Sequence, residues 1–216
     1  MRVCIALVSI AAACSAAEPD PLLKWLDNIA QKQLDTRETQ IRAITTRQGI
    51  VARQAHVRAK ILELIGGLPD YNGPLNAQPR GEIRLPGVVI EKIIFETLPQ
   101  AYVTANLYRP DKPGKFPGIL LPLGHWEYGK PAVQTIAANF ALKGFVVLTY
   151  DPWGQGERKQ IYYARYGNSL ANQATEQHLL AGGLSALLGQ SFARYRIWDA
   201  KRALDYLVSR PEVITD

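Results

Sequence analysis

The chain has 216 residues, of which 47% are hydrophobic and 20% charged, a composition typical of a globular protein and not of a disordered or fibrous one. Its formal net charge is +6, but Lys and Arg are interleaved with Asp and Glu, so no basic stripe of the kind that binds nucleic acid is present. Both cysteines, Cys4 and Cys14, lie near the N-terminus, so the body of the protein offers neither a disulfide framework nor a thiolate metal site.

Residues 1–17 have the pattern of a secretory signal peptide. Arg2 supplies a positive start, residues 3–13 are apolar, and residues 15–17 (Ser-Ala-Ala) are small, as signal-peptide cleavage requires. Because the apolar run is too short for a membrane span, we predict export to the periplasm or the medium and no membrane span. Lipid attachment through Cys14 is the alternative, which the absence of a branched apolar residue three positions earlier disfavours.

Residues 18–67 are predicted to form an N-terminal helical layer. Asp20 followed by Pro21 is a favourable helix start, because Asp caps free N–H groups and Pro suits the first turn. Helical composition continues to residue 65, with Gly49 as the expected break between two helices. Apolar residues recur at helical spacing in both halves, at Leu22, Leu26 and Ile29 and at Val57, Ile61, Leu64 and Ile65.

Residues 68–216 are predicted to be one α/β domain that starts with an antiparallel strand pair. Residues 68–80 are rich in Pro, Asn and Gly and are expected to form a loop. Residues 88–97 and 102–108 are rich in β-branched and aromatic side chains and flank a short turn, which predicts two antiparallel strands. A turn-rich connector, residues 109–117, leads into the next strand.

A strand, a helix and a second strand follow. Residues 118–123 and 145–150 are almost continuously hydrophobic, as is typical of parallel strands covered by helices on both faces. Pro131 suits the first turn of the helix between them, and Lys143-Gly144 stops it. The apolar positions of this helix are Val133, Ile136, Ala137 and Phe140.

The loops after these two strands are the predicted ligand-binding loops, because ligands bind beyond the carboxyl ends of the strands in an open parallel sheet. They are residues 124–130 and residues 151–158. Residues 159–190 show no clear periodicity and are expected either to form a lid or a binding loop or to be poorly ordered.

A last helix is predicted over residues 192–208, ended by Pro211, and a parallel strand should follow it. The apolar positions of this helix are Ile197, Ala200, Leu204 and Leu207.

The first of the two loops also matches the phosphate-binding motif G-x-x-x-x-G-K, from Gly124 to Lys130. However, Pro131 stands where a Ser or Thr hydroxyl would ligate magnesium, and it lacks the N–H that would face a phosphate. Trp126 and Tyr128 are bulky where the backbone would have to approach an anion closely. Nucleotide binding is therefore the disfavoured alternative, and no cofactor is predicted.

No nucleophile or metal motif is found. Acyl transfer through Ser needs G-x-S-x-G on a strand-turn-helix, and neither Ser169 nor Ser185 has that context. The three histidines, His56, His125 and His178, lack metal-ligand spacing, so no metal is predicted. His56 is interpreted as a surface residue, His125 as either a site residue or a structural hydrogen-bonding group, and nothing local decides for His178.

Four blocks of sequence together resemble one family. They are V-T-A-N-L-Y-R-P (residues 103–110), F-P-G-I-L-L-P-L-G-H (116–125), G-F-V-V-L-T-Y-D-P-W-G-Q-G-E-R (144–158) and A-R-Y-R-I-W-D-A-K-R-A-L-D-Y-L-V-S-R-P-E-V (193–213). In this order and spacing they are similar to secreted bacterial α/β-hydrolases related to acetyl xylan esterases, over residues 62–216. The resemblance implies a partial α/β-hydrolase fold: an N-terminal helical layer, an antiparallel strand pair, and the start of a parallel sheet with covering helices.

The resemblance also implies roles for site residues. In the family, the loop after the first buried parallel strand supplies an oxyanion-hole N–H, which falls on His125 or Trp126 here. Residues 151–158 shape the floor of the site, and we expect Trp153 and Tyr128 to contact the substrate. The segment S-R-P-E-V normally leads into the nucleophile strand, so the Ser, the acid and the His of the family's triad all lie beyond residue 216.

Two interpretations follow. In the first, the chain is the N-terminal part of an exported serine esterase acting on a small-molecule or carbohydrate ester. It is then inactive alone, and it self-associates through residues 118–123, which become an open sheet edge. In the second, it is a complete non-catalytic protein that binds carbohydrate through Trp126, Tyr128 and Trp153.

Overall fold

The computed structural model describes residues 20–171 and 173–215, so the predicted signal peptide lies outside the described residues. The chain divides into two compact units between His56 and Val57. The first contains α1 (Pro21–Arg42) and the start of α2 (Arg47–Ile65). The Asp20 carboxylate caps α1 as predicted, since it accepts the Leu22 N–H at 2.8 Å.

The break between the two helices lies at residues 43–46, so the prediction that Gly49 forms it is wrong. Gly49 lies in the first turn of α2, where its N–H donates to Thr46 Oγ1 at 3.1 Å. Thr46 thus caps the helix, and a capping side chain starts a helix more strongly than one glycine breaks it. Of the second predicted apolar face, only Ile65 is buried.

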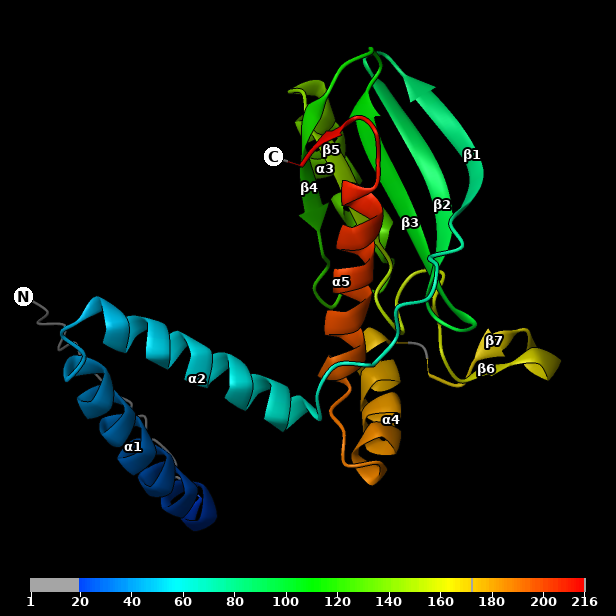
Figure 1. The fold of residues 1–216 in the computed structure, drawn as a ribbon. Helices are drawn as coiled ribbons and strands as arrows, with labels where there is room; N and C mark the ends of the chain where they lie inside the picture. The colour runs from blue at the N-terminus through cyan, green and yellow to red at the C-terminus, as the bar shows by residue number, and fades with distance from the viewer. Residues whose placement is uncertain (1–19, 172, 216) are drawn as a thin grey trace, which may run out of the picture. The chain divides into compact units, whose positions relative to one another are not determined.

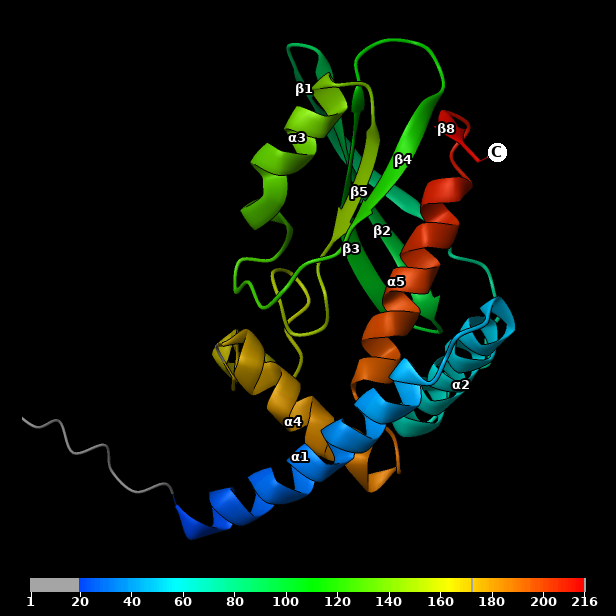
Figure 2. The same cartoon turned by 90° about the vertical axis from the view of Figure 1, so that its left-hand side faces the viewer.

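The second unit, residues 57–216, is built on a six-stranded mixed sheet with the order β1-β2-β3-β5-β4-β8 (Figures 1 and 2). The strands are β1 (Gln78–Leu85), β2 (Val88–Leu98), β3 (Ala101–Pro110), β4 (Phe116–Leu121), β5 (Val146–Tyr150) and β8 (Val213–Ile214). β1, β2, β3 and β5 pair antiparallel in turn, whereas β4 pairs parallel with both β5 and β8. The predicted antiparallel pair and the predicted parallel unit are both confirmed.

Helices cover the two faces of this sheet at different heights (Figure 2). The connection from β4 to β5 runs through the 3-10 helix η1 (Lys130–Val133) and α3 (Gln134–Leu142). α3 buries Ala137 and Ala141 against one face of the sheet, on a cluster formed by Val88, Ile90, Tyr108 and Val147. This cluster occupies only the part of the face near the start of β2, and α3 does not cover the rest of that face.

α5 (Ala193–Val208) packs on the opposite face, over the larger core. The core side chains from the sheet include Phe95, Leu107 and Leu148, all fully buried. The predicted apolar face of this helix is partly wrong, because Ile197 is 42% and Leu204 45% exposed. The helix instead buries Trp198, Asp199, Arg202, Ala203, Tyr206 and Leu207.

The hydrophobic pattern of the sequence did not predict two further elements, β1 and α4 (Ala174–Leu187). Residues 78–80 belong to β1 and not to a loop, and β1 exposes every one of its residues, so it shows no alternation. The segment 159–190 contains a small hairpin and the 14-residue helix α4. The hairpin consists of β6 (Tyr162–Tyr163), η2 (Ala164–Tyr166) and β7 (Asn168–Ser169). α4 holds two glycines, Gly182 and Gly183, and has no apolar stripe to reveal it.

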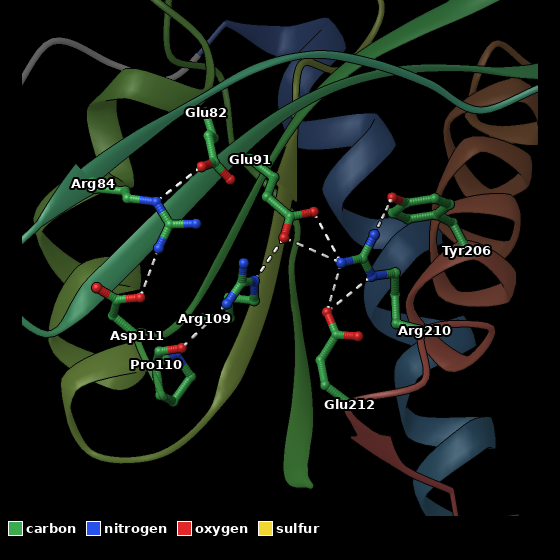
Figure 3. Close-up of polar contacts among 9 residues, drawn as sticks. All are labelled: Glu82, Arg84, Glu91, Arg109, Pro110, Asp111, Tyr206, Arg210 and Glu212. Carbon is green, nitrogen blue, oxygen red and sulfur yellow. Dashed lines mark hydrogen bonds and ion pairs between the residues drawn. The ribbon is translucent and has the colours of Figure 1, made fainter. Parts of the chain in front are cut away.

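At the amino ends of the parallel strands, a cluster of ion pairs fixes the start of β8 (Figure 3). Glu91 on β2 accepts from Arg109 on β3 at 2.6 Å and pairs with Arg210 at 2.9 Å. Arg210 also binds Glu212 at 2.7 Å, directly before β8. Because these groups are only partly exposed, they hold the chain that leaves α5 in register with the sheet.

The open edge of β4 follows from the shortness of β8. Only Phe116 and Pro117 pair with β8, so residues 118–121 have no strand partner on that side within the described chain. Unpaired edges of this kind are templates for intermolecular pairing. Self-association through this edge therefore stays a prediction.

None of the described helices is long and apolar enough to cross a membrane.

Candidate functional site

The two predicted ligand loops are joined by one buried carboxylate, Asp151, at the end of β5. Its side chain is fully buried. It accepts the backbone N–H of Lys130 at 2.7 Å and the Lys130 ammonium at 2.5 Å. It also accepts the hydroxyl of Thr104 at 2.8 Å and the N–H of Glu157 at 3.2 Å. A buried charge is tolerated only when it is paired and hydrogen-bonded in this way.

Two glycines allow the backbone to approach this carboxylate. Gly129 and Gly156 have φ values of +69° and +55°, which non-glycine residues rarely adopt. A Cβ added to Gly129 would overlap Asp151 Oδ1, and one added to Gly156 would lie 2.6 Å from Asp151 Cγ. Both loops therefore wrap around Asp151 with no room for a side chain. We call this arrangement the Asp151 clamp: Asp151, Lys130, Gly129 and Gly156.

The clamp explains the phosphate-binding motif seen in the sequence. The last two residues of the motif, Gly129 and Lys130, surround an anion, but the anion is the chain's own carboxylate. Lys130 also pairs with Glu157 at 2.5 Å, and its side chain is almost completely buried. The lysine that would have to reach the phosphates of a nucleotide is therefore already neutralised.

A second buried ion pair ties the loop of residues 151–158 to α5. Arg158 donates to Asp199 at 2.7 Å and to the carbonyl of Asp151 at 2.9 Å. Asp199 also accepts the hydroxyl of Thr97 on β2 at 2.7 Å. The neighbouring Trp198 donates its indole N–H to the Thr97 carbonyl at 2.7 Å. Asp199, a polar residue on the buried face of α5, thus holds the helix to the loop through its ion pair with Arg158.

Within the described chain, several backbone N–H groups of the loop of residues 124–130 donate to no protein group, namely those of Gly124, His125, Glu127 and Tyr128. The fully buried Gln155 side chain holds the loop by donating to the carbonyls of Gly124 at 2.7 Å and Trp126 at 2.8 Å. The Trp126 N–H donates to the Gly124 carbonyl at 3.0 Å. The His125 N–H has no partner among the described residues. Of the two predicted oxyanion donors, only His125 therefore has an N–H that is free to bind a ligand.

The predicted aromatic contacts lie in different surroundings. Trp126 is 56% and Tyr128 79% exposed. Trp153 is half-buried, with its ring 4.9 Å from the guanidinium of Arg158 and 6.1 Å from Phe192. Trp126 and Tyr128 are therefore open to a ligand, whereas Trp153 helps to hold its own loop, and contact of Trp153 with a substrate stays a prediction.

His178, which the sequence left undecided, lies beside His125. The two rings are 4.8 Å apart, edge to face. His178 Nε2 donates to the Trp153 carbonyl at 2.5 Å. Burial lowers the pKa of His178 below its usual value of 6.5, although this hydrogen bond opposes the shift. At neutral pH the ring is therefore uncharged. The sequence did not indicate that His178 lies near His125, because α4, the helix that carries His178, was not predicted.

The serines considered in the sequence are structural. Ser169 is buried, donates to the Gln160 carbonyl at 2.8 Å and accepts from Gln177. Ser185 donates back to the Ala181 carbonyl at 3.0 Å within α4. Within the described residues, neither hydroxyl is hydrogen-bonded to a histidine. Within the described residues, no group of three His, Cys, Asp or Glu side chains could hold a metal ion.

Comparison with solved structures shows where this fold occurs. A protein described as an acetyl xylan esterase from Bacteroides fragilis matches 80% of this chain and 53% of its own, with 17% identity and a TM-score of 0.63. A methylesterase matches 87% of this chain and 38% of its own, with 21% identity and a TM-score of 0.60. Acetyl xylan esterase 1 from a Thermoanaerobacterium matches 72% and 45%, with 18% identity and a TM-score of 0.50.

At these identities the likeness establishes the fold alone, which is the partial α/β-hydrolase fold that the sequence implied. Proteins described as acetyl xylan esterases, the family that the four sequence blocks resemble, are among the solved structures with this fold. The chain spans about half the length of the first of these proteins and less of the other two. No family model matches the chain, and no curated protein matches it in sequence.

The clamp predicts a difference between two glycine substitutions. Gly129→Ala and Gly144→Ala both place a side chain at positive φ, but an added Cβ meets nothing within 4 Å at Gly144. We expect Gly144→Ala to cost about 1 kcal/mol of unfolding free energy, because only backbone strain is added. Gly129→Ala should cost about 2 kcal/mol more, because it displaces a buried paired carboxylate. Urea unfolding of the two variants measures the difference, and equal losses would contradict the clamp.

The lowered pKa of His178 predicts a pH dependence of stability. The unfolded chain binds a proton near pH 6.5 more readily than the folded chain does, so the stabilising contribution is present above pH 6.5 and is lost as the pH falls below it. We expect His178→Gln, which keeps a donor for the Trp153 carbonyl, to reduce the loss of unfolding free energy between about pH 7.5 and about pH 5.

Urea unfolding at the two pH values measures this loss. The matched control is His56→Gln on the exposed surface of α2, which should behave as the wild-type chain does. An identical pH dependence in wild-type and His178→Gln proteins would show that His178 makes no such contribution.

Proposed function

We propose that this chain is the N-terminal part of an exported serine hydrolase that cleaves carboxylic esters, with carbohydrate esters as substrates. The observation that carries the proposal is the free N–H of His125, held at the carboxyl end of β4 by Gln155. A fixed N–H without a protein partner is the donor that stabilises the oxyanion of an acyl-transfer intermediate. Trp126, the other candidate, already uses its N–H in the turn.

The sheet topology supports the same proposal. β8 runs parallel to β4 and lies directly beside it. A nucleophile elbow at the carboxyl end of that strand would place a serine next to residues 124–130. The serine Oγ would attack the ester carbonyl while a histidine accepts its proton, and the His125 N–H would bind the oxygen that becomes negative. In this proposal, the serine, the acid and the histidine would lie in sequence that follows residue 216.

The substrate class rests on two observations. Proteins with this fold are named acetyl xylan esterases and a methylesterase, which points to esters with a small acyl or alkyl group. Trp126 and Tyr128 are exposed on the same loop as His125, where their rings are free to stack on a sugar. Residues 1–17 would direct the protein out of the cytoplasm and so to the compartment in which polysaccharide substrates occur.

The exposed rings of Trp126 and Tyr128 also favour a second candidate, a protein that binds carbohydrate without catalysis. The hydrolase is preferred because the N–H of His125 follows β4, the strand that pairs parallel with β8, and sugar stacking alone does not require that arrangement. Nucleotide binding has no support, since the lysine of the motif is enclosed in the Asp151 clamp.

We expect the 216-residue chain alone to hydrolyse acetyl esters no faster than background, because the nucleophile lies outside it. A fluorophosphonate probe should label none of its serines, whereas a longer protein that includes the following strand should be labelled once, in a G-x-S-x-G motif. Sequencing of the coding region beyond the codon for residue 216 tests for the same G-x-S-x-G motif and needs no purified protein. Labelling of Ser169, or a stop codon directly after residue 216, would favour the non-catalytic candidate.

The oxyanion role is tested by removing one N–H at a time from the longer protein. His125→Pro should lower kcat about 10²- to 10³-fold, because one oxyanion donor is lost. His125→Ala keeps the N–H and should retain kcat within about tenfold of wild type. Trp126→Pro is the matched control for proline in this loop. A larger loss from Trp126→Pro than from His125→Pro would move the donor to Trp126.

A further inference from the structure

A cavity of about 540 Å³ lies on the face of the sheet that α3 leaves uncovered. Along β2, Ile90, Lys92 and Ile94 face the same side, but only Ile90 is covered by α3. Lys92 and Ile94 therefore form part of the cavity floor, together with Thr104 and Asn106 of β3. The volume lies within the range of roughly 300–1,000 Å³ that is usual for small-ligand sites.

The walls of the cavity come from the two ligand loops. Glu127, Tyr128 and Lys130 line it from the loop after β4, and Glu157 and Lys159 line it from the loop after β5. His125 and Trp126 do not line it. The cavity thus shares the loop of residues 124–130 with the candidate oxyanion donor but takes up the other end of that loop.

The charges in this cavity do not balance. Lys130 pairs with both Asp151 and Glu157, so this group of three side chains retains one negative charge. Within the described chain, Lys92 and Lys159 have no ion-pair partner, and Arg80 at the rim contacts only the side-chain oxygen of Gln78. Against these three cations stand that remaining negative charge and the carboxylate of Glu127. The cavity lining therefore carries one excess positive charge, which a monovalent anionic ligand would neutralise.

We propose that this cavity binds a carboxylated sugar, a uronate unit of the carbohydrate that carries the ester. The sugar class rests on the proposed function, whereas the negative charge rests on Arg80, Lys92 and Lys159 alone. The exposed ring of Tyr128 offers a stacking surface for a pyranose, and Ile94 offers an apolar floor. Glu127 accepts hydroxyl protons of a sugar but repels a phosphate dianion, so a monovalent carboxylate fits better than a phosphate.

Equilibrium dialysis of the full chain tests the proposal, with trigalacturonate as the probe and galactotriose as its neutral counterpart. We expect trigalacturonate to bind at least tenfold more tightly at low salt, and this preference to shrink as salt is raised. The double substitution Lys92→Gln and Lys159→Gln should weaken trigalacturonate binding about tenfold and leave galactotriose binding unchanged. Lys143→Gln, an exposed lysine outside the cavity, is the matched control and should change neither.

A second variant gives a gain that misfolding cannot imitate. Glu127→Gln keeps an acceptor for sugar hydroxyls but removes a negative charge, so trigalacturonate should bind about two- to fivefold more tightly. Equal binding of the acidic and neutral sugars, an unchanged affinity in the double variant, or tighter binding of inorganic phosphate than of galacturonate would overturn the proposal.

The esterase proposal and the uronate-binding proposal can be disproved independently, because equilibrium dialysis measures binding and requires no hydrolysis. Binding of trigalacturonate by a protein whose longer form has no esterase activity would remove only the proposed function. Hydrolysis of a neutral acetylated sugar by the longer protein, with no preference for uronate binding in the cavity, would remove only this inference.

Discussion

The fold of the ligand-binding end depends on a carboxylate that water cannot reach. Asp151 leaves β5 fully buried, and its negative charge is stable there only because Lys130 and several N–H and O–H donors surround it. The donors come from three parts of the chain, Lys130 of η1, Thr104 of β3 and Glu157 of the loop after β5, so satisfying the charge fixes where the loops run. Removal of one partner leaves an uncompensated buried charge, which makes the arrangement all-or-none. The hydrophobic core holds the strands, but this one charge sets the shape of the loops.

The same clamp separates two surfaces that belong to one loop. Residues 124–130 present His125 and Trp126 near their start and Tyr128 and Lys130 near their end. Gln155 holds the start, whereas Asp151 holds the end. A ligand that contacts both ends would therefore meet a fixed spacing between the proposed oxyanion donor and the cavity proposed to bind a uronate. In the proposed hydrolase, this spacing would select where the ester lies along a sugar chain, without movement of the protein.

The sequence predicts the elements that are held by apolar burial and fails for those held by polar contacts. β2, β3 and β5 carry strong apolar signals, and the structure has them within two residues of the expected bounds. α4 and β1 were missed because neither has an apolar stripe, and the face of α5 was partly misjudged because Asp199 and Arg202 are buried on it. In the site, the loops were identified from topology, but the role of Lys130 was not, because a motif does not show which anion it surrounds.

The long hydrogen bond path from Thr97 through Asp199 to Arg158 also bears on the order of folding. Thr97 and Asp199 are 102 residues apart in the chain, and Arg158 and Asp199 are 41 apart. Hairpins such as β2–β3 close over a few residues, whereas contacts of long range carry a larger entropic cost and form later. The Arg158 end of the loop of residues 151–158 therefore gains its last contacts only after α5 has docked. A nascent chain would carry its sheet core well before it carries a competent binding surface.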